Sequence, residues 1–285
     1  MKKLVSEDAI PTPGSLADTL CKRYWPGPLT LLFKKSNNVA NNVTAGQPFV
    51  AVRMPSHPIA RKLIELADLP IAAPSANVSG RPSPTQASHV LQDLNGIIHC
   101  VIDGGSTDVG LESTVVDLNR EPPLILRPGG VTLEQLREVI PTIQVYEKHV
   151  HGTQLEQKPP TPGLKYRHYS PTAKVILFED DGSLESMQNR IEGKLKEEWS
   201  KKHTVGIIHT HPKLAYRIPD ELKSQAVFYN LGDDQQPDLV AKGIFGALRE
   251  LDSQGVHIIF IEGISEKNEG MAVMNRVRKA ASETF

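Results

Sequence analysis

Short apolar segments alternate along the chain with longer segments in which apolar residues recur every three or four positions. In the first half, short segments predict strands at 29–33, 49–54, 71–73, 97–102, 113–118 and 124–126, and longer ones predict helices at 16–25, 57–68, 85–94 and 132–140. Residues 1–14 are polar, contain two prolines and are expected to form a tail. Several consecutive strands between helices favour an open mixed α/β sheet.

The second half alternates more regularly. Strands are predicted at 174–178, 205–209, 226–231 and 257–261, and helices at 184–199, 239–251 and 271–281. Two of these strands are almost wholly apolar, which is typical of a parallel sheet with helices on both faces. We therefore expect a smaller, doubly wound, Rossmann-like α/β domain. It lacks the glycine-rich turn of dinucleotide-binding domains.

The alternation stops between residues 141 and 171, in a stretch that contains His149, His151, Pro159, Pro160, Pro162 and Gly163. Such a stretch is typical of a connection between domains. Three parts are predicted: an α/β domain at 1–140, a linker at 141–172 and a second α/β domain at 173–285. The linker ends in Lys165-Tyr166-Arg167-His168-Tyr169, which is too aromatic and too basic for a simple spacer.

Composition and charge narrow the class of protein. With 39% hydrophobic and 23% charged residues, the 285-residue chain is typical of soluble globular proteins, and its length suits two domains. The formal net charge of -1 gives no overall attraction to nucleic acid or to an anionic membrane, so an RNA contact would be weak and local. Two cysteines form no disulfide framework, and neither a membrane helix nor a secretory signal is evident, so a cytoplasmic location is expected.

A loop of small polar residues connects the predicted strand 71–73 to the next helix. It contains Ser75, Asn77, Ser79, Arg81 and Ser83. Ser83, Pro84 and Gln86 match a capping box at the start of the helix. Free backbone N–H groups at such a helix start can bind phosphate. An ordinary strand–loop–helix connection is the alternative.

Three further strands of the first domain end in basic or hydroxyl side chains: Arg53, Ser113 with Thr114, and Arg127. Ligands of open α/β sheets bind at strand ends, so we expect one crevice to receive these residues and the loop. A guanidinium group can hold a carboxylate or a phosphate through two parallel hydrogen bonds. For both arginines, a structural ion pair is the alternative.

Two other chemistries have less support. No G-x-S-x-G nucleophile motif is present, because Ser75 lies in Pro-Ser-Ala-Asn, and no base or acid accompanies it. His209 and His211 could bind a metal at a strand end, but two such ligands without a third are more often surface residues. No metal site is predicted.

Together, these segments resemble a known family. AVRMPSHPIA (51–60), PIAAPSANVSGRPSPT (70–85), IDGG, ESTVVD and LRPGG closely resemble, in order and spacing, the C-terminal two-thirds of the YrdC-like domain of threonylcarbamoyl-AMP synthases, as does RYWPGPLTLLF (23–33). TPGLKYRHYSP (161–171) and EGMAVMNRVRKAA (269–281) are similar to the long, two-domain form of that enzyme. The resemblance extends from about Leu16 to the C-terminus.

The resemblance implies a nucleotidyltransferase that makes L-threonylcarbamoyl-AMP and pyrophosphate from L-threonine, bicarbonate and ATP. A downstream transferase complex then uses the product in tRNA modification. By the same resemblance, threonine contacts Arg53, Ala73 and Ser113, and ATP contacts Ser75, Ser83, Arg127 and Tyr169. Asn77 is added as an ATP contact on chemistry alone, because its amide can order the loop or a phosphate oxygen.

The reaction type fits these residues. In-line attack on a phosphate requires positioning and positive charge, so no catalytic acid or base is predicted. Magnesium would accompany ATP, and no tightly bound cofactor is expected. Carbamate and mixed anhydride both react with water, so Tyr166, Arg167 and His168 are expected to form a lid.

The chain departs from the family pattern at two places. The family domain begins with a strand and loop of the type T-E-T-V-Y-G-L-G and a basic K-x-R…N-P-L segment, and residues 1–16 do not replace them. The YrdC-like domain is therefore expected to be N-terminally truncated, with little or no turnover by this chain alone. Phe49 also stands where a small polar residue is common. The alternative function is a non-catalytic nucleotide- or RNA-binding fragment of the family.

Overall fold

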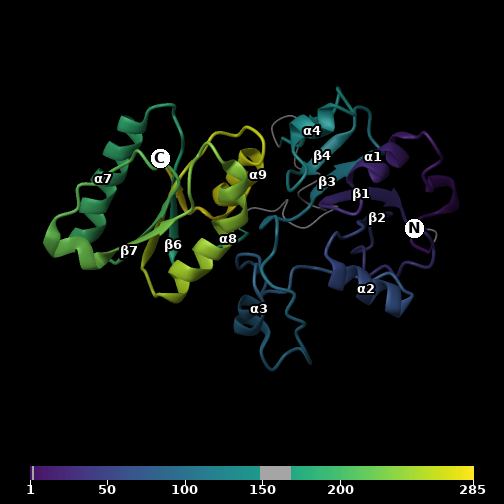
Figure 1. Cartoon of the computed structure of the whole chain (residues 1–285), viewed down its shortest axis with the longest axis horizontal. Helices are drawn as coiled ribbons and strands as arrows, with labels where there is room; N and C mark the ends of the chain where they lie inside the picture. The colour runs from purple at the N-terminus through teal and green to yellow at the C-terminus, as the bar shows by residue number, and fades with distance from the viewer. Residues whose placement is uncertain (2, 148–167) are drawn as a thin grey trace. The chain divides into compact units, whose positions relative to one another are not determined.

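The computed structural model describes residues 1, 3–147 and 168–285, which divide into two compact units (Figure 1). The first unit contains Met1–Pro74 and Glu112–Lys165, and the second contains Ser75–Leu111 and Tyr166–Phe285. The units therefore differ from the predicted boundaries, because residues 75–111 pack with the C-terminal half of the chain rather than with the sheet that precedes them.

The first unit is built on a five-stranded sheet with the order β2-β1-β3-β4-β5. Its strands are β1 (Leu29–Lys34), β2 (Phe49–Val52), β3 (Thr114–Asp117), β4 (Leu124–Arg127) and β5 (Gln144–Val145). The pairs β1–β2 and β3–β4 are antiparallel, and the pairs β1–β3 and β4–β5 are parallel. This confirms the open mixed sheet. Strand β5 lies inside the predicted linker, so the first part of that linker belongs to the sheet.

Three helices accompany this sheet: α1 (Leu16–Tyr24), α2 (Pro58–Ala67) and α4 (Leu133–Arg137). Their ends follow local capping chemistry. The Ser15 side chain accepts a hydrogen bond from the Asp18 N–H at the start of α1. The predicted capping box of α4 is confirmed, since Thr132 and Gln135 each accept a bond from the other's backbone N–H.

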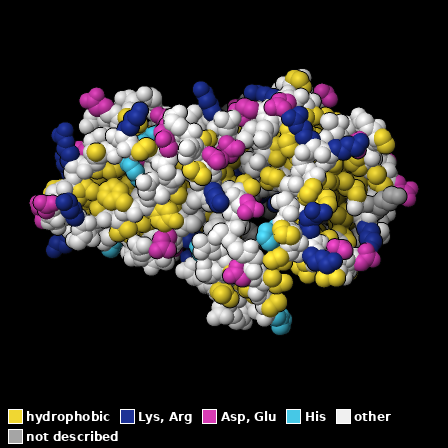
Figure 2. Space-filling model, viewed as in Figure 1, with side chains coloured by type: hydrophobic (Ala, Val, Ile, Leu, Met, Phe, Trp, Pro, Cys, Tyr) yellow, Lys and Arg dark blue, Asp and Glu magenta, His cyan; other side chains and the backbone are white. Residues whose placement is uncertain are grey.

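Helix α2 has an exposed apolar face. Ile59, Leu63 and Leu66 follow one another at helical spacing and are 41, 47 and 73% exposed. No residue of α2 is buried. Apolar side chains reach the surface of this unit in the space-filling view (Figure 2). The amphipathic pattern predicted the helix correctly but not the environment of its apolar side.

Two predicted strands are wrong. Residues 71–73 and 97–102 form no strand, and Ile71, Ile97 and Ile102 are 45, 70 and 60% exposed. An apolar sequence is not sufficient for a strand, because a strand needs a neighbouring strand with which to exchange backbone hydrogen bonds. Segment 71–73 is also flanked by Pro70 and Pro74, which have no N–H to donate.

The predicted capping box at Ser83 is also wrong, since α3 covers Ala87–Leu94 and begins after Gln86. The Thr85 N–H instead donates to Nδ1 of His89, at 3.2 Å. Burial and the neighbouring Arg249 lower the pKa of His89, which keeps this nitrogen available as an acceptor.

The N-terminal residues do not form a free tail. Val5 is buried and bridges to Lys35, and the Ser6 N–H donates to the Lys34 carbonyl. A short 3-10 helix, η1 (Glu7–Ala9), follows. The segment is fixed because the end of β1 and the residues that follow it supply backbone partners.

The second unit contains a parallel sheet with the order β10-β6-β9-β7-β8. Its strands are β6 (Lys174–Phe178), β7 (Val205–His209), β8 (Ala226–Asn230), β9 (Ile258–Glu262) and β10 (Glu283–Thr284), with the 3-10 helix η2 (Asp220–Gln225) before β8. The helices are α3, α7 (Leu184–Ser200), α8 (Pro237–Ser253) and α9 (Gly270–Ala280). The doubly wound arrangement is confirmed.

Alternation along β6 explains the two layers that cover this sheet. Val175 and Leu177 pack with α8 and α9, whereas Ile176 and Phe178 pack with α7 on the opposite face. Figure 1 shows α7 on one side of β6 and β7, and α8 and α9 on the other. Both faces are therefore buried, as the near-continuous apolar strands predicted.

Candidate functional site

Ser113 and Arg127 come together in the first unit, at neighbouring ends of β3 and β4. Nε and Nη2 of Arg127 both donate to the Ser113 carbonyl, at 3.3 and 3.1 Å, and Nη2 lies 3.5 Å from Ser113 Oγ. Ser113 Oγ is 2.6 Å from Oγ1 of Thr30, and both of these residues are buried. The result is a cluster of one fixed cation and two hydroxyl groups.

The local sequence explains this geometry. A Cβ at Gly129 would lie 2.5 Å from the Ser113 carbonyl carbon and 2.6 Å from the Thr114 nitrogen. Only glycine therefore lets the Pro-Gly-Gly turn pass so close to the start of β3. Thr114 Oγ1 donates to the Val131 carbonyl and accepts from its N–H, at 2.5 and 2.9 Å. These contacts tie the turn after Arg127 to the strand after Ser113.

Arg53 lies just beyond β2 in the same unit. Its Nε donates to the Gly27 carbonyl at 2.9 Å, and the Gly27 N–H donates to the Met54 carbonyl at 2.9 Å. Partial burial of the guanidinium lowers the pKa of Arg53 from its ordinary value, although the residue as a whole is exposed and the group stays charged near neutral pH. The backbone contact fixes the side chain and leaves further N–H donors for an anion. Ala73, the third predicted threonine contact, is exposed.

The predicted loop contacts belong to the second unit. Ser75 is exposed and Ser83 is buried. Nδ2 of Asn77 donates to the carbonyls of Val78 and Arg81, at 2.7 and 3.3 Å, so this amide orders the loop. The predicted ATP contacts are thus divided between the two units, with Arg127 in the first.

The described end of the linker is anchored in the second unit. Tyr169 is 1% exposed, and its ring lies 5.1 Å from that of Phe245 and beneath the Arg276 guanidinium. Its φ of +65° is rare for a residue other than glycine. This position does not expose the ring to a nucleotide, so an ATP contact by Tyr169 requires a different conformation. The His168 N–H donates to the Lys279 carbonyl, while Tyr166 and Arg167 lie outside the described residues.

A polar cluster stands at the carboxyl ends of β7 and β9. The buried Glu262 accepts hydrogen bonds from His209 Nδ1 at 2.6 Å, from the Thr210 and His211 N–H groups at 2.7 and 2.9 Å, and from the Tyr216 hydroxyl. Burial alone would raise the pKa of Glu262, but these donors lower it overall. Burial beside Glu262 strongly raises the pKa of Tyr216. Both histidines therefore take part in this hydrogen-bond network.

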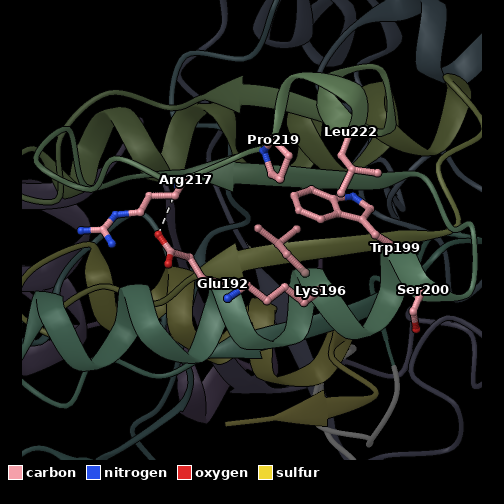
Figure 3. Close-up of a pocket in the computed structure, with 8 residues that line it drawn as sticks. Glu192, Lys196, Trp199, Ser200, Arg217, Pro219 and Leu222 are labelled. Atoms are coloured by element: carbon pink, nitrogen blue, oxygen red, sulfur yellow. Dashed lines mark hydrogen bonds between the residues drawn. The ribbon is translucent and has the colours of Figure 1, made fainter.

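A pocket of about 300 Å³ lies between α7 and the segment that precedes β8 (Figure 3). It is lined by Glu192, Leu195, Lys196, Trp199, Ser200, Arg217, Pro219 and Leu222. The Arg217 N–H donates to Glu192 at its edge. None of the predicted site residues that the structure describes lines this pocket.

The described part of the chain contains neither a cluster of metal ligands nor a membrane-spanning helix. No group of three or more histidine, cysteine, aspartate or glutamate residues there could hold a metal ion. None of the helices described is long and apolar enough to cross a membrane.

Comparison with known proteins matches the chain to two family models in succession. A Sua5/YciO/YrdC family model, described as telomere recombination, matches residues 4–129, and a model of the C-terminal domain of threonylcarbamoyl-AMP synthase matches residues 131–282. The chain belongs to the threonylcarbamoyl-AMP synthase family. It is 48% identical to the threonylcarbamoyl-AMP synthase of Pyrococcus abyssi over 93% of this chain and 73% of the relative, and 44% identical to that of Bacillus subtilis over 93% and 72%.

Solved structures of this family agree with the fold. A variant of P. abyssi Sua5 with two alanine substitutions is 44% identical, covers 100% of this chain and 77% of its own, and gives a TM-score of 0.86. P. abyssi Sua5 in complex with L-threonine is 42% identical, with 99% and 80% coverage and a TM-score of 0.85. The resemblance of the sequence to this family is confirmed.

Sequence patterns missed three residues of this structure. Thr30 stands in an apolar strand, but the parallel register of β1 and β3 brings its hydroxyl to Ser113. Asp93 and Arg249 form a buried ion pair in the second unit, and 156 residues separate them in the sequence. The only sequence signal for this pair was that each residue is a charged residue among the apolar positions of its helix, α3 for Asp93 and α8 for Arg249.

Proposed function

We propose that the chain acts as an L-threonylcarbamoyl-AMP synthase, a nucleotidyltransferase that forms threonylcarbamoyl-AMP and pyrophosphate from L-threonine, bicarbonate and ATP. The observation that carries this proposal is the cluster at the ends of β3 and β4, where Arg127 is held against Ser113 and Thr30. A fixed guanidinium beside two hydroxyl groups suits an anionic substrate with polar atoms. A related protein, P. abyssi Sua5, has been solved with L-threonine.

The proposed substrate contacts follow the family motifs. Threonine would contact Arg53, Ala73 and Ser113, and ATP would contact Ser75, Asn77, Ser83, Arg127 and, after release from its buried position, Tyr169. Tyr166, Arg167 and His168 would form the lid. The corresponding division of the sequence is a catalytic domain at 1–140, a lid-bearing linker at 141–172 and a C-terminal domain at 173–285.

The chemistry uses charge and position. Threonine and bicarbonate first give a carbamate with release of water, and a carbamate oxygen then attacks the α-phosphate of ATP as the bond to pyrophosphate breaks. Arg127 would neutralise phosphate charge, and Arg53 would hold the threonine carboxylate. Magnesium, bound to ATP as part of the substrate, would supply further positive charge. No side chain is required as a general acid or base.

The chemistry of the product indicates which other macromolecules would take part. A mixed anhydride of this kind is an activated donor, so a downstream tRNA-modifying transferase would consume it, and RNA contact by this chain would be weak and local. A cytoplasmic setting is consistent with the free thiols of Cys21 and Cys100.

The test combines binding with turnover. Calorimetry of the purified chain is expected to show separate binding of L-threonine and of ATP with magnesium, and Arg127→Gln is expected to weaken ATP binding about tenfold or more, since it removes a charged contact worth about 1.5–3 kcal/mol. Pyrophosphate release, whatever its rate, is expected only when threonine, bicarbonate and ATP are all present. Release that does not depend on threonine, or no binding of threonine, would refute the proposal.

A further inference from the structure

Residues 75–111, here named the 75–111 segment, contact one face of helix α8 in the C-terminal half of the chain. Gly110 lies directly on the α8 backbone, where a Cβ would fall 2.6 Å from the Ala241 carbonyl oxygen and also clash with Lys242. One turn further on, Thr85 faces Gly246, with Oγ1 3.7 Å from the position of a Cβ. Arg249 follows at the next turn. Residues 242, 246 and 249 lie on one face of a helix, so the contact is continuous.

Arg249 binds the segment at two points. Its Nε and Nη2 donate to the Pro82 carbonyl, at 3.0 and 2.7 Å. Its Nη1 and Nη2 donate to the two carboxylate oxygens of Asp93, at 3.2 and 2.7 Å. The side chains of Arg249 and Asp93 are 1 and 0% exposed. One guanidinium therefore links α8 both to the loop before α3 and to α3 itself.

Further contacts extend this link. Arg81 of the loop donates to Asp93 at 2.5 Å and to Asp252 of α8 at 3.3 Å. Asp252 also accepts from the Ala173 N–H at 2.9 Å, and the Ser170 N–H donates to the Gly80 carbonyl at 2.8 Å. Burial would raise the pKa of Asp93, but its bonds to Arg249 and the attraction of both arginines lower it overall. Asp93 is thus an ionised centre shared by both arginines.

The segment has little core of its own. Its loop residues Ser75 and Ser79 are exposed, and its apolar residues Ile97 and Ile102 are largely exposed. Its buried polar residues are Ser83, Thr85 and Asp93. The order of the loop therefore depends on contacts with α8 and its neighbours rather than on apolar packing within the segment.

We propose that α8 is the support of the loop that carries the nucleotide contacts, and that Arg249 is a positioning residue for ATP. This gives the C-terminal domain a role in the reaction without contact with the reacting atoms. The role in ATP binding rests on the proposed function, because Ser75, Asn77 and Ser83 are ATP contacts only there. Threonine contacts at Arg53 and Ser113 belong to the first unit and should depend much less on Arg249.

The experiment compares Arg249→Met with Lys242→Met in the full chain. Both remove a cation from α8, but the Lys242 side chain is exposed and only its backbone faces the segment. Hydrogen exchange followed by mass spectrometry reports the order of residues 75–111, and calorimetry reports the affinities for ATP with magnesium and for L-threonine. In Arg249→Met, we expect at least tenfold faster exchange in the segment and at least tenfold weaker ATP binding, with threonine affinity within twofold of the wild type. Lys242→Met should match the wild type.

A double variant separates positioning from general stability. Replacing a buried ion pair by apolar residues often preserves stability, whereas removal of one partner leaves a buried charge. Asp93→Leu with Arg249→Met is therefore expected to recover part of the melting temperature lost by Arg249→Met, since Arg81 and the Val78 N–H also lose Asp93, but not the ATP affinity, because the bond to the Pro82 carbonyl remains absent.

Three results would overturn the proposal: unchanged exchange of the segment in Arg249→Met, equal weakening of ATP and threonine binding, or recovery of ATP affinity in the double variant. Absence of ATP binding by the wild-type chain would instead remove the proposed function and the positioning role that rests on it. The exchange data would still decide whether α8 supports the segment.

Discussion

Gly129 offers a direct test of how the site in the first unit is built. Substitution by alanine adds one methyl group, and its carbon would lie 2.5 Å from the Ser113 carbonyl carbon and 2.6 Å from the Thr114 nitrogen. Ordinary contact begins at 3.4 Å, so the second distance alone leaves an overlap of 3.4 − 2.6 = 0.8 Å. Both neighbours are backbone atoms at the start of β3, which cannot move aside by changing a rotamer.

The expected cost follows from this overlap. Insertion of one carbon into a well-packed site usually destabilises a protein by about 1–3 kcal/mol. With a urea m-value of about 2 kcal/mol/M, a loss of about 2 kcal/mol lowers the midpoint of urea unfolding by about 1 M. Because relief of the clash moves Ser113 away from Arg127, threonine affinity should fall about tenfold as well, which corresponds to about 1.4 kcal/mol.

The assay uses urea unfolding and calorimetry with L-threonine, and Gly193→Ala provides the matched control. Gly193 lies inside α7, and no atom comes within 4 Å of a Cβ there. Alanine should stabilise this helix by about 0.5–1 kcal/mol without affecting threonine. An unchanged midpoint in Gly129→Ala would refute the steric argument. A lowered midpoint with unchanged threonine affinity would refute the proposed role of the Ser113–Arg127 geometry.

Two further predictions concern titrating groups. The pKa of Glu262 is lowered from 4.5, so the ionised carboxylate stabilises the fold above that value, and this stabilisation is lost as the pH falls from about 4.5 through the lower folded pKa. Glu262→Gln is expected to cost about 1–3 kcal/mol at pH 7 and to flatten the acid dependence of unfolding, measured by urea denaturation at pH 3–7; an unchanged slope would contradict the assignment. Burial and Asp18 raise the pKa of Cys21 to about 11, whereas Cys100 is exposed. At pH 8 about one Cys21 thiol in a thousand is ionised, so iodoacetamide should label Cys100 at least tenfold faster in the native protein, as mass spectrometry would show, while equal native rates would contradict the burial of Cys21.

Hydrophobic periodicity predicted the second unit well because both faces of its sheet are buried. Strands β6 and β7 match the expected ranges, and the three large helices differ from theirs by at most two residues at either end. In a sheet covered on both sides, an apolar run and a strand coincide. Outside this sheet the same rule failed at 71–73 in the first unit and at 97–102 in the second, since exposed apolar residues give the same pattern without a neighbouring strand.

The candidate site could be predicted only where it consists of short motifs. Ser113 and Arg127 belong to such motifs, and the antiparallel pairing of β3 and β4 brings them together. Thr30 could not be found in this way, because a threonine inside an apolar strand suits packing equally well. Its hydroxyl reaches Ser113 only through the register in which Thr30 lies opposite Val115. Register depends on turn geometry and on the neighbouring strands, which a single strand's sequence does not specify.

The division into units groups residues 75–111 with the C-terminal half of the chain, although they lie between two parts of the first unit in the sequence. A boundary drawn where apolar periodicity stops assumes that residues close in sequence share a core. Here the side chains of Arg249 and Asp93 are 1 and 0% exposed and pair with each other, so loss of either one would leave the other as a buried charge without this partner. That cost favours a structure in which the 75–111 segment stays packed on α8. The loop that is proposed to contact the nucleotide can therefore depend for its order on a helix of the C-terminal half of the chain.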